Sequence, residues 1–205
     1  MVNGINTLKC INLSNLTRRC AILVADMLND FVYGKLGSPS VKKLIPKLKS
    51  LIDSARECRI PVIFCNDSHS TSDRELKIWG PHAMKGTEGA EVIKELTPQS
   101  GDHVILKNTY SAFHKTKLRK VLDSLYNGKG VEEIILTGIY TDICIKHTVY
   151  DAFLDGYDII VPENGVCSFT LQKHRGALDY MKNNYSIKIE KIEDIIDELN
   201  KSKQK

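Results

Sequence analysis

The sequence EIILTGIYTDIC, residues 133–144, decides the fold. Residues 133–137 form a short, mainly aliphatic run that is apolar on both faces, which is typical of a strand buried inside a parallel sheet. Gly138 ends the run, and residues 142–155 then carry apolar side chains at helical spacing. A strand that leads directly into a helix predicts one βα unit of an α/β protein.

The same alternation of strand and helix continues on both sides of this stretch. Apolar runs predict five more strands, at residues 21–25, 61–65, 104–106, 157–161 and 186–189. Apolar stripes predict further helices at residues 41–58, 116–126, 170–183 and 192–200. Crossovers of this kind imply a parallel sheet that is covered by helices on both faces. We therefore predict an α/β protein with three layers, α/β/α, and a six-stranded, mainly parallel sheet.

Length and composition exclude several classes of protein. The 205 residues fit a single domain, with residues 1–19 as an N-terminal extension and residues 201–205 as a solvated tail. The net formal charge of +4 is scattered along the chain, so we expect no nucleic-acid partner. No apolar run approaches the roughly 20 residues of a membrane span, so we expect no membrane partner. No glycine-rich phosphate fingerprint follows the first strand, which disfavours a nucleotide-binding module.

The six cysteines predict a compartment. The start of the chain lacks the pattern of a secretory signal, and no CxxC pair occurs. We therefore expect a cytoplasmic protein with reduced thiols. Five of these thiols have no chemical context and are expected to be inert and mostly buried: Cys10, Cys20, Cys58, Cys65 and Cys167.

Polar side chains follow four of the predicted strands. In an open α/β sheet, ligands bind beyond the carboxyl ends of the strands. The residues at these ends are two carboxylates, one imidazole, one ammonium group and one thiol: Asp26, Asp67, His69, Lys107 and Cys144. A single polar residue at a strand end is common, but complementary groups on one rim favour an active site.

Cys144 is the candidate nucleophile. With Thr141 as the N-cap, Cys144 falls in the first helical turn, where free N–H groups and the helix dipole favour a thiolate. Lys107 would favour the thiolate further, and Asp26 could accept the thiol proton. The backbone N–H groups before Cys144 could hold an oxyanion. For an isolated cysteine an inert core thiol is the better interpretation, and the rim context reverses that preference.

A second group of residues has the character of a metal site. Residues 66–88 form the longest stretch without strand or helix pattern, which is typical of a functional loop. Asp67 and His69 share a face of an extended segment, and His82 returns 13 residues later. Two histidines and one carboxylate leave coordination positions open, as a catalytic metal site does. Glu75 is either a further ligand or a solvated loop carboxylate, and a solvated loop is the alternative for the whole group.

Three aromatic residues follow the same strand ends: Phe31, Trp79 and Tyr110. Aromatic side chains near convergent polar groups suit a flat ring substrate. Ordinary loop packing is the alternative for each of them.

Three motifs together resemble one known family. They are residues 26–31, Asp-Met-Leu-Asn-Asp-Phe; Lys107 followed by residues 111–113, Ser-Ala-Phe; and residues 138–144, Gly-Ile-Tyr-Thr-Asp-Ile-Cys. Over residues 20–190 the chain resembles the isochorismatase-like cysteine hydrolases, with Leu28 where glutamine is usual. The resemblance implies a Rossmann-like strand order and a catalytic triad of Asp26, Lys107 and Cys144. It also implies a cis peptide between Ile139 and Tyr140, and an oxyanion hole formed by the N–H groups of Tyr140 and Cys144.

The loop resembles one subgroup of that family, the nicotinamidases. Asp67-x-His69 and residues 79–82, Trp-Gly-Pro-His, carry this resemblance. It implies one divalent metal ion, with zinc as the first expectation and iron or manganese also suitable. The implied ligands are Asp67, His69, His82 and, as an open case, Glu75. Phe31, Trp79 and Tyr110 are implied to surround the substrate ring. The chain departs from the subgroup in the spacing within this loop and in Tyr140, where a small residue is usual.

The implied reaction is hydrolysis of nicotinamide to nicotinate and ammonia, through a thioester on Cys144, as part of pyridine nucleotide salvage. The expected partner is a small-molecule amide, and the family resemblance also implies a homo-oligomer. The nearest alternative is a cysteine hydrolase of another small amide or of a carbamoyl compound. A further alternative is a non-catalytic metal-binding or interaction protein that keeps the fold.

Overall fold

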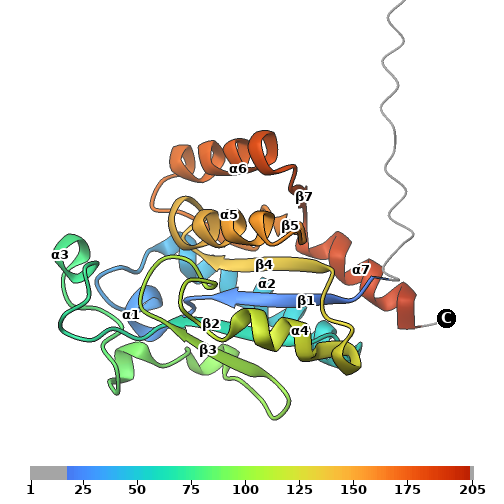
Figure 1. Cartoon of the computed structure of the whole chain (residues 1–205). Helices are drawn as coiled ribbons and strands as arrows, with labels where there is room; N and C mark the ends of the chain where they lie inside the picture. Colours follow the sequence, from blue (N-terminus) through green and yellow to red (C-terminus); the bar gives the residue numbers. More distant parts are fainter. Residues whose placement is uncertain (1–17, 204–205) are drawn as a thin grey trace, which may run out of the picture.

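A parallel sheet forms the centre of the molecule (Figure 1). The computed structural model describes residues 18–203, so Cys10, most of the predicted N-terminal extension and the last two residues of the predicted tail lie outside it. The strands are β1 (Cys20–Ala25), β2 (Val62–Asp67), β3 (His103–Lys107), β4 (Glu133–Ile139), β5 (Asp158–Pro162), β6 (Val166–Cys167) and β7 (Lys188–Glu190). Their order is β3-β2-β1-β4-β5-β7, with β6 paired to the end of β4, and every ladder is parallel.

Helices cover both faces of the sheet and complete the three predicted layers. The helices are α1 (Asn29–Val32), α2 (Pro39–Glu57), α3 (Leu76–Trp79), α4 (Leu118–Gly128), α5 (Lys146–Leu154), α6 (Leu171–Tyr185) and α7 (Ile192–Lys203), with short turns η1 (Glu88–Ala90), η2 (Lys94–Leu96) and η3 (Thr141–Ile145). Helices α2 and α7 enclose one core with the sheet, and α4, α5 and α6 enclose the other. The predicted fold class is confirmed.

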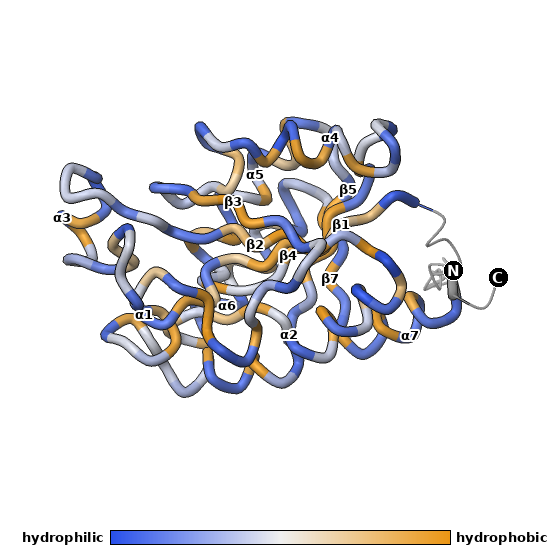
Figure 2. The backbone as a smooth tube through the Cα atoms, turned by 90° about the horizontal axis from the view of Figure 1, so that it is seen from below, coloured by the Kyte–Doolittle hydropathy of each residue, from blue (hydrophilic) through white to orange (hydrophobic). Residues whose placement is uncertain are grey.

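Alternating side chains of the strands feed these two cores. In β1, Ile22 and Val24 enter the core beside α2, whereas Ala21 and Leu23 enter the core beside α4. Figure 2 shows the central strands as largely hydrophobic, while the exposed loops are mostly hydrophilic. Because both faces are covered, these strands are apolar throughout, which is why the sequence shows continuous apolar runs. No described helix is long and apolar enough to cross a membrane.

One glycine brings β4 close to β1 at the functional end of the sheet. Gly138 pairs with Ala25 in the ladder, and its φ of 104° is one that residues with a Cβ rarely adopt. A Cβ at this position would lie 2.1 Å from the carbonyl oxygen of Ala25. Gly138 therefore allows the loop after β4 to lie against the residue that follows β1. The loop that carries α3 projects beyond the same end of the sheet (Figure 1).

Candidate active site

Three buried polar side chains meet where β1, β3 and β4 end. Nζ of Lys107, the last residue of β3, lies 2.8 Å from Oδ2 of Asp26 and 3.7 Å from Sγ of Cys144. Asp26 directly follows β1, and Cys144 lies in η3, after β4. None of the three residues is more than 5% exposed. The structure therefore brings together the aspartate, lysine and cysteine that the sequence places at separate strand ends.

The backbone holds Asp26 in a fixed orientation. Its φ of 55° lies in the left-handed region, which turns the chain sharply after β1. Oδ1 of Asp26 accepts a hydrogen bond of 2.8 Å from the N–H of Asp67. Oδ2 forms the ion pair with Lys107 and has no hydrogen-bond partner among the described residues. One carboxylate oxygen is thus fixed by the backbone, and the other faces the lysine and can receive a proton.

Burial and neighbouring charges set the protonation of the triad. Burial and the repulsion from Asp67 raise the pKa of Asp26 to about 6, although Lys107 opposes this. Burial also raises the pKa of Cys144 well above that of an exposed thiol, by more than Lys107 lowers it. Burial alone would lower the pKa of Lys107, but Asp26 and Asp67 raise it, so the ammonium group persists. Burial therefore favours the protonated thiol of Cys144, and Asp26 is the neighbouring group that can accept its proton.

The turn that carries Cys144 also differs from the sequence prediction. The N-cap is Tyr140 rather than Thr141, and η3 is a π-helical turn that precedes α5. The hydroxyl of Thr141 lies 2.9 Å from Nδ1 of His174 on α6, so it does not cap the helix. The N-cap prediction fails because this tertiary contact with α6 engages the hydroxyl. Cys144 nevertheless lies in the first turn after β4, and π turns are frequent at functional sites.

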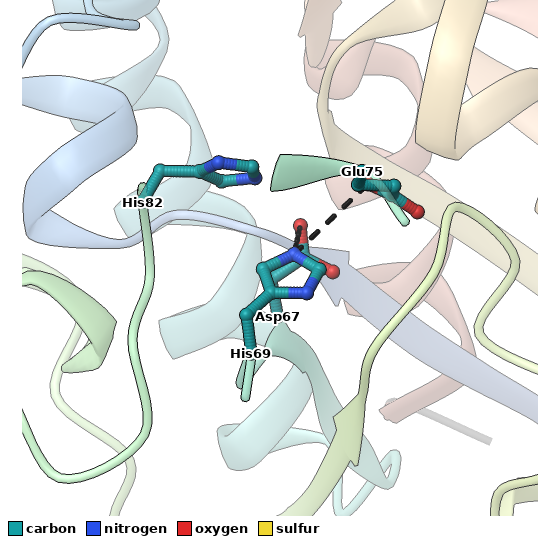
Figure 3. A group of neighbouring side chains, drawn as sticks. All are labelled: Asp67, His69, Glu75 and His82. Carbon is teal, nitrogen blue, oxygen red and sulfur yellow. Dashed lines mark ion pairs between the residues drawn. The ribbon is translucent and has the colours of Figure 1, made fainter. Parts of the chain in front are cut away.

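Four side chains from the end of β2 and from the loop that follows it converge, as Figure 3 shows. Asp67, His69, Glu75 and His82 each offer one ligand atom, and these atoms all lie within 4.8 Å of one another. Nε2 of His69 is 3.6 Å from Oδ2 of Asp67 and 4.0 Å from Oε2 of Glu75. All four residues are buried, so Glu75 is not a solvated loop carboxylate.

The atoms of these four residues fit a divalent cation. Nδ1 of His69 lies 3.1 Å from Oδ2 of Asp73, and Nδ1 of His82 lies 2.8 Å from the carbonyl oxygen of Gly80. Each acceptor favours the hydrogen on Nδ1, which leaves Nε2 as the lone pair for a metal. Nε2 of His69 and Oε1 of Glu75 are buried without a hydrogen-bond partner among the described residues. Burying a polar atom without a partner costs folding free energy, so these two atoms favour a bound cation.

The charges of this group support the same interpretation. Burial and the repulsion from Asp67 raise the pKa of Glu75 to about 7. Burial alone would lower the pKa of His69, but bonds to Asp67 and Asp73 raise it. Both residues therefore bind a proton more readily than they would in water, and a divalent cation would compete with the proton for the same atoms. Histidine and carboxylate ligands suit zinc, iron and manganese alike.

One pocket joins the triad to this cation site. Both Cys144 and Asp67 line it. All three aromatic residues expected around the substrate line it as well: Phe31, Trp79 and Tyr110. Tyr140 is a further lining residue, and its peptide bond with Ile139 is cis. Sequence reasoning missed three lining residues, Leu36, Ile143 and Phe169, and it also missed Asp73, the partner of His69.

Comparison with known proteins agrees with this geometry. A family model described as an isochorismatase domain matches residues 20–193. The chain belongs to the isochorismatase family. It is 32% identical to nicotinamidase 3 of Arabidopsis thaliana over 164 residues, which cover 77% of this chain and 78% of the relative.

Two solved structures have the same fold as this chain. The N-carbamoylsarcosine amidase of Thermoplasma acidophilum superposes with a TM-score of 0.78 at 36% identity, covering 85% of this chain and 96% of that one. A nicotinamidase/pyrazinamidase of Bacillus subtilis superposes with a TM-score of 0.77 at 30% identity, covering 84% of this chain and all of that one, 100%. The protein is therefore an isochorismatase-like cysteine hydrolase, and its relatives include a nicotinamidase and an N-carbamoylsarcosine amidase.

Proposed function

We propose that this protein is a metal-containing nicotinamidase, which hydrolyses nicotinamide to nicotinate and ammonia. One observation carries the proposal. Asp67 belongs to the four-residue cation site and also accepts a hydrogen bond from Lys107 of the triad. A cation bound there would lie in the same pocket as Cys144, beside aromatic side chains that suit a flat ring.

The proposed chemistry begins with the thiol of Cys144. Asp26 takes the thiol proton, and Sγ attacks the carboxamide carbon to form a C–S bond. The backbone N–H groups of Tyr140 and Cys144 hold the oxyanion. Asp26 then returns the proton to the leaving nitrogen, the C–N bond breaks, and ammonia departs. Water attacks the resulting thioester with Asp26 as base, which releases the carboxylic acid and restores the thiol. Lys107 keeps Asp26 in place and offsets its charge.

The proposed metal ligands are Asp67, His69, Glu75 and His82, and zinc is the proposed ion. When bound, the ion would supply a Lewis-acidic position for a ring nitrogen of the substrate. The pocket suits a small substrate, and a cytoplasmic role in pyridine nucleotide salvage is part of the proposal. The five described cysteines are free, as that compartment requires.

The decisive experiment measures ammonia release from nicotinamide by metal-replete protein, beside a panel of other small amides. We expect nicotinamide to be the preferred substrate, and Cys144→Ala to abolish release while the circular dichroism spectrum stays unchanged. Retained activity in Cys144→Ala would exclude this thiol as the nucleophile. A Cys144 that also resists electrophiles in the intact protein would favour a non-catalytic role.

A second candidate is a hydrolase of carbamoyl compounds. It is favoured by the 36% identity to an N-carbamoylsarcosine amidase. In this candidate function, Asp26, Lys107 and Cys144 would act on a substrate without an aromatic ring. Preferred release of ammonia from an N-carbamoyl amino acid, unaffected by removal of the metal, would select this candidate.

A further inference from the structure

Tyr140 forms one wall of the pocket and is firmly held there. Its ring stacks on Phe169, with centroids 4.1 Å apart and planes 25° apart, and meets the ring of Phe31 edge-on at 6.3 Å. Its hydroxyl donates a hydrogen bond to the carbonyl oxygen of Leu36. Only 3% of Tyr140 is exposed. The ring is thus fixed by the segment before α2 on one side and by the segment before α6 on the other.

Phe169 extends this wall toward the loop that carries the cation site. Its other stacking partner is Trp79, with centroids 5.9 Å apart and planes 17° apart. Nε1–H of Trp79 donates a hydrogen bond of 3.2 Å to the hydroxyl of Tyr110. A continuous row of aromatic rings therefore runs from Tyr140 through Phe169 and Trp79 to Tyr110, and all four residues line the pocket. Tyr140 and Phe169 each contact neighbours on two sides, so these two rings are the firmly packed end of the row.

We infer that Tyr140 and Phe169 set the size limit of the substrate. The rings leave a narrow space that takes a flat carboxamide with a single ring and excludes ring-fused carboxamides. Both residues act as specificity-determining residues through their side chains, separately from any role of the Tyr140 backbone in catalysis. This inference rests on the proposed amidohydrolase function and adds the substrate class to it.

The first test compares kcat/KM for nicotinamide and for quinoline-3-carboxamide, which fuses a second ring to the same pyridine carboxamide. We expect the wild-type protein to favour nicotinamide by at least about tenfold, a usual size for discrimination by pocket shape. Tyr140→Ala should reduce this ratio by about tenfold or more. Tyr140→Phe is the matched control, because it keeps the ring and loses only the bond to Leu36, and it should keep the wild-type ratio.

Phe169→Leu provides a second variant, because Tyr140→Ala removes a buried ring and can weaken folding. Phe169 is only partly buried, so this change disturbs the core less. We expect it to reduce the ratio as Tyr140→Ala does. If both variants lose activity on the two amides equally, or if the wild-type protein hydrolyses both alike, the inference is wrong.

Alkylation of Cys144 separates this inference from the proposed function. The wild-type protein should react faster with iodoacetamide than with a bulky naphthyl iodoacetamide, and Phe169→Leu and Tyr140→Ala should selectively speed the bulky reagent. Cys144→Ala identifies any labelling of other thiols. No ammonia from nicotinamide together with this selective gain would reject the proposed substrate but support the size limit. Hydrolysis of nicotinamide without any selective gain would support the proposed substrate but reject the size limit.

Discussion

The carboxylate of Asp67 accepts a hydrogen bond from Lys107, so the candidate metal ligand and the lysine of the triad share one contact. The other oxygen of Asp67 lies 3.6 Å from Nε2 of His69, within the cation site. Lys107 in turn lies 2.8 Å from Asp26. Charged groups in contact thus link the candidate metal ligands to the proton acceptor, Asp26. A substitution at Asp67 is therefore expected to affect proton transfer by the triad as well as metal binding.

The first prediction concerns this shared carboxylate. Asp67→Asn should lower metal content and should also lower kcat, because Lys107 loses a charged partner. His82→Asn is the matched variant, since His82 belongs to the cation site and its ring bonds to the backbone of Gly80 rather than to the triad. We expect excess zinc to restore much of the activity of His82→Asn but little of that of Asp67→Asn. Metal content by mass spectrometry and ammonia release check this, and full rescue of Asp67→Asn would contradict it.

Asp73 is predicted to orient His69 for the metal. Its Oδ2 lies 3.1 Å from Nδ1 of His69, and partners of this kind are worth about 10–100-fold in metal affinity. Asp73→Ala should therefore weaken zinc binding by that factor in a competition assay with a chromophoric chelator. Ser70→Ala is the control, because it removes one bond to Asp73 and leaves the carboxylate beside His69. Equal zinc affinity in the wild-type protein and Asp73→Ala would remove this role.

Asp26 is predicted to control the reactivity of Cys144 in the metal-free protein. The folded-state pKa of Asp26 is about 6, raised above its ordinary value by burial and by Asp67. Below that pH the carboxyl group already carries a proton and cannot accept the one on sulfur. The rate of alkylation by iodoacetamide should therefore rise as the pH increases through about 6 and then level off. Asp26→Asn should lack this step, and an identical profile in that variant would exclude Asp26 as the acceptor.

Gly138 is predicted to be essential for stability at the end of the sheet. In Gly138→Ala the new Cβ would lie 2.1 Å from the carbonyl oxygen of Ala25. Left-handed strain and overpacking together cost about 2–5 kcal/mol. Gly128→Ala is the control, because Gly128 also has a positive φ, 79°, but a Cβ added there would meet no atom within 4 Å, so only the strain of about 1–2 kcal/mol remains. Urea unfolding measures both, and equal losses would refute the close approach.

The periodic parts of the fold could be predicted from the sequence, because each of these strands and helices carries its own apolar pattern. Strand β6 could not, since its two residues are too few to show a pattern. The raised pKa of Cys144 could not be predicted, because the sequence does not reveal that burial outweighs the nearby ammonium group. Asp73 and Phe169 were missed for a related reason. Their importance lies in contacts with His69 and Tyr140, and neither residue type signals such a contact.

All four candidate ligands, Asp67 to His82, come from the end of β2 and the single loop that follows it. Residues of the triad come from three different strand ends instead. Under the proposed assignment, one insertion or deletion between β2 and β3 could remove the metal and change the substrate while the nucleophile stays in place. New specificities within this fold can therefore arise by exchange of one segment, and transplanting residues 67–82 into a relative that lacks these ligands is a route to engineer them.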